Sequence, residues 1–226
     1  MYFIKDQIMS YRAINWALTQ QVDKFPSKLV LLALADAAHA SKGMTTYISK
    51  TGLSKKTGLA FETVNRHLSL LEEKGFISSK PCPEVPERLI FKVKVHRSFK
   101  QPFRGHQTIR SIMEHKCDFS NTRNYLLMLA LAHRMEVEFE ADEVIETGLV
   151  RANQSEISRN TGLCRKTIRK SLDQLKAEKK ISEEFCDEYQ KPAFRISERY
   201  LPARSKNSFV ARHLDTSWAT GIGMSI

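Results

Sequence analysis

Two groups of mainly polar and charged residues lie 104 positions apart and have side chains suited to contacts with the edges of nucleic-acid bases. The first group is Phe61, Glu62, Asn65, Arg66 and Ser69, and the second is Arg165, Lys166, Arg169, Lys170 and Asp173. Arginine can pair with guanine, asparagine with adenine and glutamate with the cytosine amino group, while phenylalanine can touch the thymine methyl group. The first group is therefore a mixed set that can discriminate between bases. In the second, four of the six residues from 165 to 170 are basic, which favours phosphate binding together with guanine recognition.

Each group also has a simpler interpretation as an ordinary protein surface. Glu62 and Arg66 are four residues apart and could form an ion pair on one face of a helix. The basic residues of the second group could form a solubilising face. We favour nucleic-acid binding for the second group, because its basic residues gather at the helix end that would enter a groove.

Both groups belong to a repeated segment. Residues 53–71 and 157–175 align without a gap and share Thr-Gly-Leu, a later threonine and the apolar positions that follow. The pattern predicts helix, tight turn, helix in each copy: Ser49 or Asn153 can cap a short first helix, and the glycine supplies the turn. The second helix is expected over about 60–74 in the first copy. Its apolar stripe is formed by Val64, Leu68 and Leu71, and in the second copy by Ile168, Leu172 and Leu175.

The second helix of each copy is expected to begin without a side-chain cap. The preceding residue is Ala60 in one copy and Cys164 in the other, and neither is a preferred N-cap residue. The free backbone N–H groups there could bind a phosphate. Thr63 and Thr167, at matched positions, could cap, pack or contact a phosphate.

Each copy is preceded by an apolar helix and followed by two strands that form a wing. The helices are expected over residues 28–39 and 125–134, which share Leu-Ala-Leu-Ala. After this motif the second copy has seven extra residues, where the acidic run 136–146 is expected to be a solvated face or loop. The wing strands are predicted at 76–78 and 88–95, around the proline-rich loop 81–86, and at 180–185 and 193–196, around a turn at 187–191. Candidate contacts to a phosphate backbone on the wings are Lys80, Arg88, Lys191 and Arg195.

Several stretches of the first copy carry a resemblance to a known family. They are Ile14-Asn15-Trp16-Ala17, residues 27–35, Leu53 with Thr57-Gly58-Leu59, Thr63-Val64, and residues 71–77. With these residues the first unit resembles the winged helix-turn-helix domain near the start of phage and plasmid replication proteins. The second unit looks like the same kind of domain but ends in Glu178-Lys179-Lys180 instead of Glu-Lys-Gly.

The resemblance implies a fold that is mainly α with small β wings (α+β), built as two tandem winged-helix domains. It also implies sequence-specific binding of double-stranded DNA, with replication initiation at iterated origin sites of a plasmid, phage or phage satellite as the role. Such an initiator would need no cofactor and would recruit a host replication helicase or its loader. A transcriptional repressor or a centromere-binding partition protein would use the same domains. A winged helix that has become a protein-interaction module is a further alternative, which the basic residues 165–170 disfavour.

The charge of the chain supports a polyanionic partner. The 226 residues carry a formal net charge of +11, and neutralising phosphates with Lys and Arg releases condensed counterions. The charge is segmental: residues 96–123 carry six basic and two acidic residues, whereas residues 124–152 carry two basic and six acidic ones.

Other chemistries have little support in the sequence. The four cysteines form no CxxC pair, and the spacing of His106, His115 and Cys117 matches no metal-ligand pattern. No phosphate-cradling glycine motif and no paired-histidine motif of a nicking enzyme occurs. Tyr125 lies in an apolar stretch and is interpreted as a core residue. We therefore expect no enzyme activity and no metal. No signal peptide or membrane span is recognisable, so a cytoplasmic location is expected.

The domain organisation follows from the repeat. We expect an N-terminal winged-helix domain at 1–96, a basic linker at 97–122 that is helical over 108–115, a C-terminal winged-helix domain at 123–201 and a loose tail at 202–226. A homodimer is possible, with residues 2–4 and 14–22 as the candidate surfaces. Because the two basic and polar groups differ, a long asymmetric DNA footprint is expected.

Overall fold

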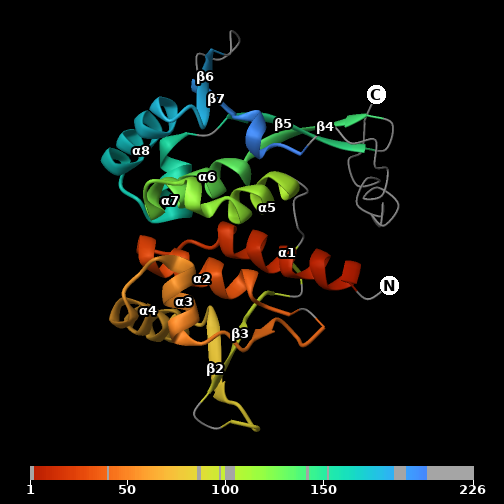
Figure 1. The fold of residues 1–226 in the computed structure, drawn as a ribbon, viewed down its shortest axis with the longest axis vertical. Coiled ribbons are helices and arrows are strands. Elements are labelled where there is room, and N and C mark those ends of the chain that lie inside the picture. The colour runs from red at the N-terminus through yellow and green to blue at the C-terminus, as the bar shows by residue number, and fades with distance from the viewer. Residues whose placement is uncertain are drawn as a thin grey trace.

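The structure is a computed structural model that describes residues 3–39, 41–85, 88–96, 98–99, 105–140, 143–151, 153–185 and 192–202. In these residues the chain forms eight α-helices, two short 3-10 helices and seven strands in two antiparallel sheets (Figure 1). The predicted α+β class is confirmed.

The N-terminal half contains four helices and a three-stranded sheet. The helices are α1 (Phe3–Thr19), α2 (Phe25–Asp36), α3 (Lys50–Thr57) and α4 (Phe61–Glu73), and the strands are β1 (Thr45–Thr46), β2 (Ile77–Pro81) and β3 (Leu89–Val93). β3 lies between the other two strands and is antiparallel to both. α2 is the central helix, since its residues 27–35 are buried on every side. It begins before the predicted start because Pro26 has a φ suited to the first helical turn.

The C-terminal half repeats this order with one addition. Its helices are α5 (His106–Glu114), α6 (Thr122–Ala132), α7 (Gln154–Thr161) and α8 (Arg165–Ala177), and its strands are β4 (Met135–Glu140), β5 (Glu143–Arg151), β6 (Ile181–Phe185) and β7 (Pro192–Ile196). The sheet order is β4-β5-β7-β6. Short 3-10 helices span Lys116–Asp118 and Glu198–Tyr200.

The two helix–turn–helix segments form as the sequence predicts. The Ser49 hydroxyl accepts from the backbone N–H of Gly52 at 3.0 Å, and the Asn153 amide oxygen accepts from that of Glu156 at 2.8 Å. Gly58 and Gly162 end the first helices with φ of 73° and 68°, a left-handed conformation that glycine adopts at little cost. The residues before α4 and α8, Ala60 and Cys164, make no side-chain cap, as expected.

Of the two structures expected for the acidic run 136–146, a solvated face or a loop, the structure shows a solvated face formed by strands. Residues 136–140 lie in β4 and residues 143–146 in β5, and the two strands pair antiparallel with Phe139 opposite Val144. Apolar residues alternate with glutamates along β4, and this period of two is the pattern of a strand. The Phe139 side chain is 61% exposed, so the hairpin presents an acidic surface with one large apolar side chain.

Residues 106–114, expected within the linker, form α5 in the core of the C-terminal half. Ile109 and Ile112 of this helix are fully buried, and α5 packs on α6. The carboxylate of Glu146 accepts from the backbone N–H groups of Gln107 and Thr108, both at 2.8 Å, and so caps the start of α5. Residues 97 and 100–104 of the expected linker and residues 203–226 of the expected tail lie outside the described residues.

The two halves meet through reciprocal contacts. A Cβ at Gly58 would lie 3.3 Å from the Thr122 side chain at the start of α6, and a Cβ at Gly162 would lie 2.9 Å from the backbone nitrogen of Phe25 at the start of α2. Gly58 and Gly162 are matched in the repeat, and so are Phe25 and Thr122 in the alignment of Leu-Ala-Leu-Ala. Each turn thus contacts the partner half at the equivalent place, which is the property of an approximate two-fold axis.

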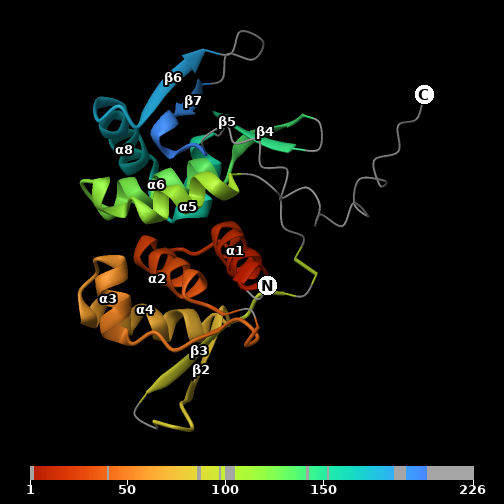
Figure 2. The same ribbon diagram turned by 45° about the vertical axis from the view of Figure 1, so that its right-hand side comes forward.

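Packing at this axis is continuous. Buried apolar residues of both halves belong to one hydrophobic cluster. The ring of Tyr11 on α1 meets the ring of His106 on α5 edge to face, with centroids 3.8 Å apart. The hairpins β2–β3 and β6–β7 project at opposite ends of the molecule (Figures 1 and 2). We conclude that the relative placement of the halves is fixed by packing.

The C-terminal end of α1 is held by a buried lysine. The Lys28 ammonium donates to the carbonyl oxygens of Ala17, Leu18 and Gln20 at 2.6, 2.9 and 2.7 Å. Helix-terminal carbonyls lack intrahelical partners, so the ammonium supplies the donors they need. Burial lowers the pKa of Lys28 to about 7.

The apolar residues of the stretch 14–22 are part of this same core. Ile14, Ala17, Leu18 and Val22 are buried within the chain, so they do not form the dimer surface that we expected there. Tyr2 and the side chains of Phe3 and Ile4, the other expected dimer surface, lie outside the described part.

Candidate nucleic-acid interface

Helix α4 presents the predicted polar group to solvent. Its inner face is formed by Val64, His67, Leu68 and Leu71. On its outer face Phe61 is 44% exposed, Glu62, Arg66 and Ser69 are exposed, and Thr63 and Asn65 are half-buried. The Nδ1 atom of His67 lies 2.7 Å from the Ser27 hydroxyl, within hydrogen-bonding distance. The pKa of the His67 imidazole is lowered, first by burial and then by the charges of Arg66 and Lys24. His67 thus fastens the inner face of α4 to α2.

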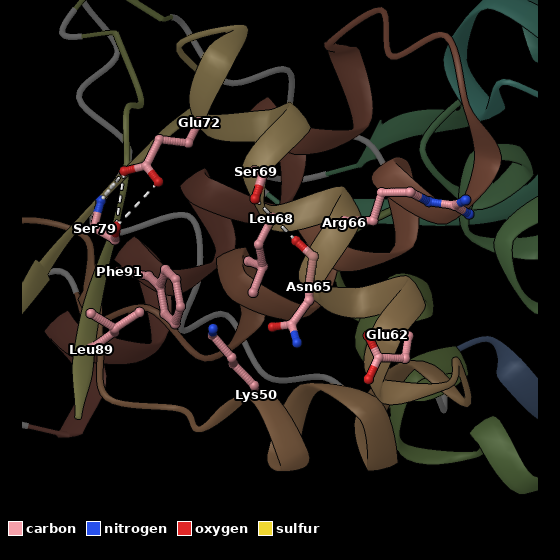
Figure 3. Close-up of a pocket in the computed structure, with 10 residues that line it drawn as sticks. All are labelled: Lys50, Glu62, Asn65, Arg66, Leu68, Ser69, Glu72, Ser79, Leu89 and Phe91. Atoms are coloured by element: carbon pink, nitrogen blue, oxygen red, sulfur yellow. Dashed lines mark hydrogen bonds between the residues drawn. The ribbon is translucent and has the colours of Figure 1, made fainter. Parts of the chain in front are cut away.

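A groove of about 320 Å³ lies between α4, the start of α3 and the β2–β3 hairpin (Figure 3). Its lining includes Lys50, Asn65, Ser69 and Phe91. At one end the Glu72 carboxylate accepts from the backbone N–H and the hydroxyl of Ser79, at 2.7 and 2.9 Å. These two hydrogen bonds connect α4 to β2, so the helix and the hairpin together form one wall of the groove.

Asn65 and Arg66 point to different sides of α4. Both residues line the groove, and Figure 3 shows the Asn65 amide directed towards Lys50 and the Arg66 guanidinium extending away from Lys50. The Asn65 Oδ1 atom is buried and has no hydrogen-bond partner among the described residues. The ion pairs of the described residues do not include Glu62 with Arg66, so the surface pair that the sequence allowed is not formed.

The four basic residues at the start of α8 fall into two pairs, two arginines that are hydrogen-bonded to α7 and two lysines that are not. Arg165 donates from Nη2 to the Ser155 hydroxyl at 2.9 Å, and Arg169 donates from Nε to the Gln154 amide oxygen at 3.1 Å. Both arginines are therefore braced against the start of α7. Lys166 and Lys170 are exposed, and no ion pair in the described part of the chain includes either of them. Asp173, at the far end of the group, pairs with Lys176 at 3.3 Å.

The matched threonines are half-buried beside the uncapped helix starts. The Thr167 hydroxyl lies 3.1 Å from the Cys164 sulfur, and this hydrogen bond lowers the pKa of the exposed Cys164 thiol. The Thr63 hydroxyl makes no side-chain hydrogen bond within the described part of the chain, and the matched Ala60 has no polar side-chain atom to offer one.

The predicted wing residues have different surroundings. Lys80 on β2 and Arg88 before β3 are exposed. Arg195 on β7 forms an ion pair with Glu184 and donates to the Thr147 carbonyl oxygen at 3.0 Å. The Glu184 carboxylate raises the pKa of Arg195 and holds its guanidinium within the sheet. Lys191 lies outside the described residues.

Helices α4 and α8 lie on the same side of the molecule. In Figures 1 and 2 both helices are on the left, and in Figure 1 the acidic hairpin β4–β5 extends to the right. The two helices that carry the predicted polar and basic residues thus share one side of the molecule, and the acidic hairpin extends away from that side.

Sequence reasoning missed two residues of this surface, Lys50 and Gln154. They are the first residues of α3 and α7 and lie beside Asn65 and Arg169, respectively. They are also 104 positions apart, so alignment of the repeat over the first helices as well as the second would have paired them.

Further expectations concern the interior and the rest of the surface. Tyr125 is buried at 8% exposure, and burial raises its pKa far above the ordinary value, so its interpretation as a core residue is confirmed. Over the described ranges, no three His, Cys, Asp or Glu side chains gather into a possible metal site. No helix in this part of the chain has the length and apolar character needed to cross a membrane.

No protein-family model matches the chain, and no curated protein is detectably similar to it in sequence.

Proposed function

We propose that this protein binds double-stranded DNA sequence-specifically through two winged-helix units, with α4 and α8 as the recognition helices. The observation that carries the proposal is the placement of two matched helix–turn–helix segments on one side of a rigid molecule, each with an exposed polar or basic face and an adjoining hairpin. The major groove admits one α-helix, and a hairpin beside it can reach the flanking backbone. Among the described wing residues, Lys80 and Arg88 are exposed and can contact this DNA backbone.

The division of labour between the units follows from their side chains. The α4 unit offers Phe61, Glu62 and Asn65 for base edges, and its Arg66 is placed for the backbone. The α8 unit offers Lys166 and Lys170 for phosphates. Arg195 is left out of the contact set, because its guanidinium is already paired with Glu184.

The approximate two-fold axis changes the expected shape of the DNA site. Recognition helices related by a two-fold axis read half-sites in inverted orientation, about one helical turn apart. The two half-sites are expected to differ in sequence, because α4 and α8 differ in side chains. A quasi-symmetric site with unlike halves replaces the wholly asymmetric footprint that the sequence suggested.

The biological role we propose is replication initiation at iterated origin sites of a plasmid, phage or phage satellite. The protein would bind and distort origin DNA in the cytoplasm and recruit a host helicase or its loader, with no catalytic step or cofactor of its own. The support is the resemblance of residues 14–77 to replication proteins. Regulation of transcription or plasmid partition is the alternative, and one palindrome over the gene's own promoter, instead of repeated sites in an adjacent origin, would favour it.

The test is selection of bound duplexes from a random pool, followed by affinity measurements over a range of salt concentrations. We expect one preferred site. We also expect the logarithm of the binding constant to fall linearly with the logarithm of the salt concentration, with a slope proportional to the number of phosphate contacts. Lys166→Ala and Lys170→Ala should each reduce the slope by about 1. Lys42→Ala, on the loop between α2 and β1, is the matched control and should leave the slope of the salt dependence unchanged. Absence of any preference for a selected duplex over random DNA would refute the proposal.

A further inference from the structure

The two recognition units contain the same pair of chemical groups in exchanged positions. Lys50 and Gln154 are matched first residues of α3 and α7, and Asn65 and Arg169 are matched residues of α4 and α8. In the N-terminal unit the cation is on the first helix and the amide on the second. In the C-terminal unit the amide is on the first helix and the cation on the second.

The structure brings both pairs together across the two helices. Gln154 Oε1 accepts from Arg169 Nε at 3.1 Å. Lys50 and Asn65 line the same groove, and Figure 3 shows the ammonium and the amide directed to the same part of it. Gln154 thus orients Arg169 through a hydrogen bond, whereas Lys50 and Asn65 share one groove without a hydrogen bond between them.

The bond from Gln154 determines which atoms of Arg169 remain available. Nε is occupied, and no hydrogen bond from Nη1 or Nη2 is formed to a described residue. These two nitrogens are the donors that arginine uses for the O6 and N7 atoms of guanine. Gln154 thus leaves Arg169 in the form that selects a G·C pair.

Asn65 is suited to the other base pair. Its amide can donate to N7 and accept from N6–H of adenine. The Oδ1 atom that would accept is the buried one without a partner among the described residues. A buried acceptor without a donor is unfavourable, so a ligand that supplies an N–H at this place gains affinity by relieving it.

We propose that Lys50–Asn65 and Gln154–Arg169 are the specificity-determining pairs of the two half-sites. Asn65, beside Lys50, selects A·T, and Arg169, positioned by Gln154, selects G·C at the equivalent place of the other half-site. This single difference breaks the symmetry of the site and gives the protein one orientation on it. The inference rests on the proposed DNA binding and adds the base pairs that are read.

The experiment uses the full chain and a library built on the selected wild-type site, with only the base pairs under the two pairs randomised. Wild type should select A·T in one half-site and G·C in the other. The exchange variant Lys50→Gln with Asn65→Arg should select G·C in both, with a change in preference of about tenfold or more at the altered half-site. Lys42→Ala, which changes an exposed side chain on the loop between α2 and β1, should leave both selections unaltered.

A second variant tests the positioning role of Gln154. Gln154→Ala should reduce the discrimination between G·C and A·T opposite Arg169 while leaving the salt dependence of binding unchanged. A purely structural or phosphate-binding role predicts an equal loss of affinity on all duplexes, and that result would overturn the assignment.

The outcomes separate the two proposals. If wild type prefers no duplex, DNA recognition itself fails. If wild type prefers a site but the exchange variant, with an unaltered unfolding temperature, selects the same base pairs, the pair assignment fails and DNA recognition stands. Should the exchange variant not fold, Asn65→Ala decides: selectivity lost at one base pair supports the assignment, and uniform loss over the site overturns it.

Discussion

Substitution of Gly162 by alanine tests the contact that holds the two halves at a fixed placement. The φ of this residue is +68°, and an alanine in the left-handed region costs about 1–2 kcal/mol. The new Cβ would also lie 2.8 Å from the Val22 carbonyl oxygen and 2.9 Å from the Phe25 nitrogen. Both atoms belong to the backbone of the other half, so they cannot rotate away, and overpacking of this kind costs about 1–3 kcal/mol.

Two other glycines provide matched controls. Gly43 has a φ of +70° and nothing within 4 Å of its added Cβ, so Gly43→Ala carries the backbone cost alone. Gly58 has a φ of +73°, and its Cβ would meet only a side-chain methyl of Thr122 at 3.3 Å. Gly58→Ala should therefore fall close to Gly43→Ala. Gly162→Ala should be less stable than Gly43→Ala by about 1–3 kcal/mol.

Denaturant unfolding gives the free energies, and the shared core predicts one cooperative transition for both halves. Equal stability of the Gly162→Ala and Gly43→Ala variants would refute the packing argument. The same variants report on binding: Gly162→Ala should weaken binding to a complete two-half site more than to a duplex with one half-site, since only the former requires the native spacing of α4 and α8.

Two further predictions concern buried side chains whose pKa is lowered by burial, Lys28 and His106. Lys28→Met should destabilise the fold by about 3 kcal/mol, because three helix-terminal carbonyls lose their donor. Since burial lowers the folded-state pKa of Lys28 from 10.5 to about 7, the unfolded state binds more protons between these values, and the stability of wild type relative to Lys28→Met should rise with pH across that window, as measured by denaturant unfolding. For His106, burial first and Arg110 second lower the pKa from 6.5 to about 4, so stability should fall as the pH drops through this range, by at most about 3 kcal/mol. Thermal unfolding of His106→Phe at pH 7 and pH 4 should show a smaller loss than wild type, and an equal loss would exclude His106 as the source.

The sequence alone determined the local structure of the two helix–turn–helix segments. Ser49, Asn153, Gly58 and Gly162 act on residues within one helical turn, so their effect does not depend on the rest of the chain. The apolar stripes of α4 and α8 have the helical period and could be assigned to the buried face for the same reason. The exposed polar groups of both helices follow directly from these stripes.

Tertiary structure decided how these segments are combined. Lys50 lies near Asn65, and Gln154 near Arg169, only because each pair of helices crosses at a particular angle, which packing determines. The sequence predicted that Arg195 contacts DNA, but in the folded sheet it forms an ion pair with Glu184 on the neighbouring strand. The hairpin of the acidic run joins the C-terminal sheet through the pairing of β5 with β7, which are distant in sequence.

The relation between the halves also comes from tertiary structure. A repeat of 104 residues is compatible with a translation or with a rotation of one copy relative to the other. The reciprocal contacts of Gly58 with Thr122 and of Gly162 with Phe25 select an approximate two-fold axis. Such contacts depend on the surfaces left after each half has folded, and this is why the sequence predicts the two units but not the geometry with which they face a common partner.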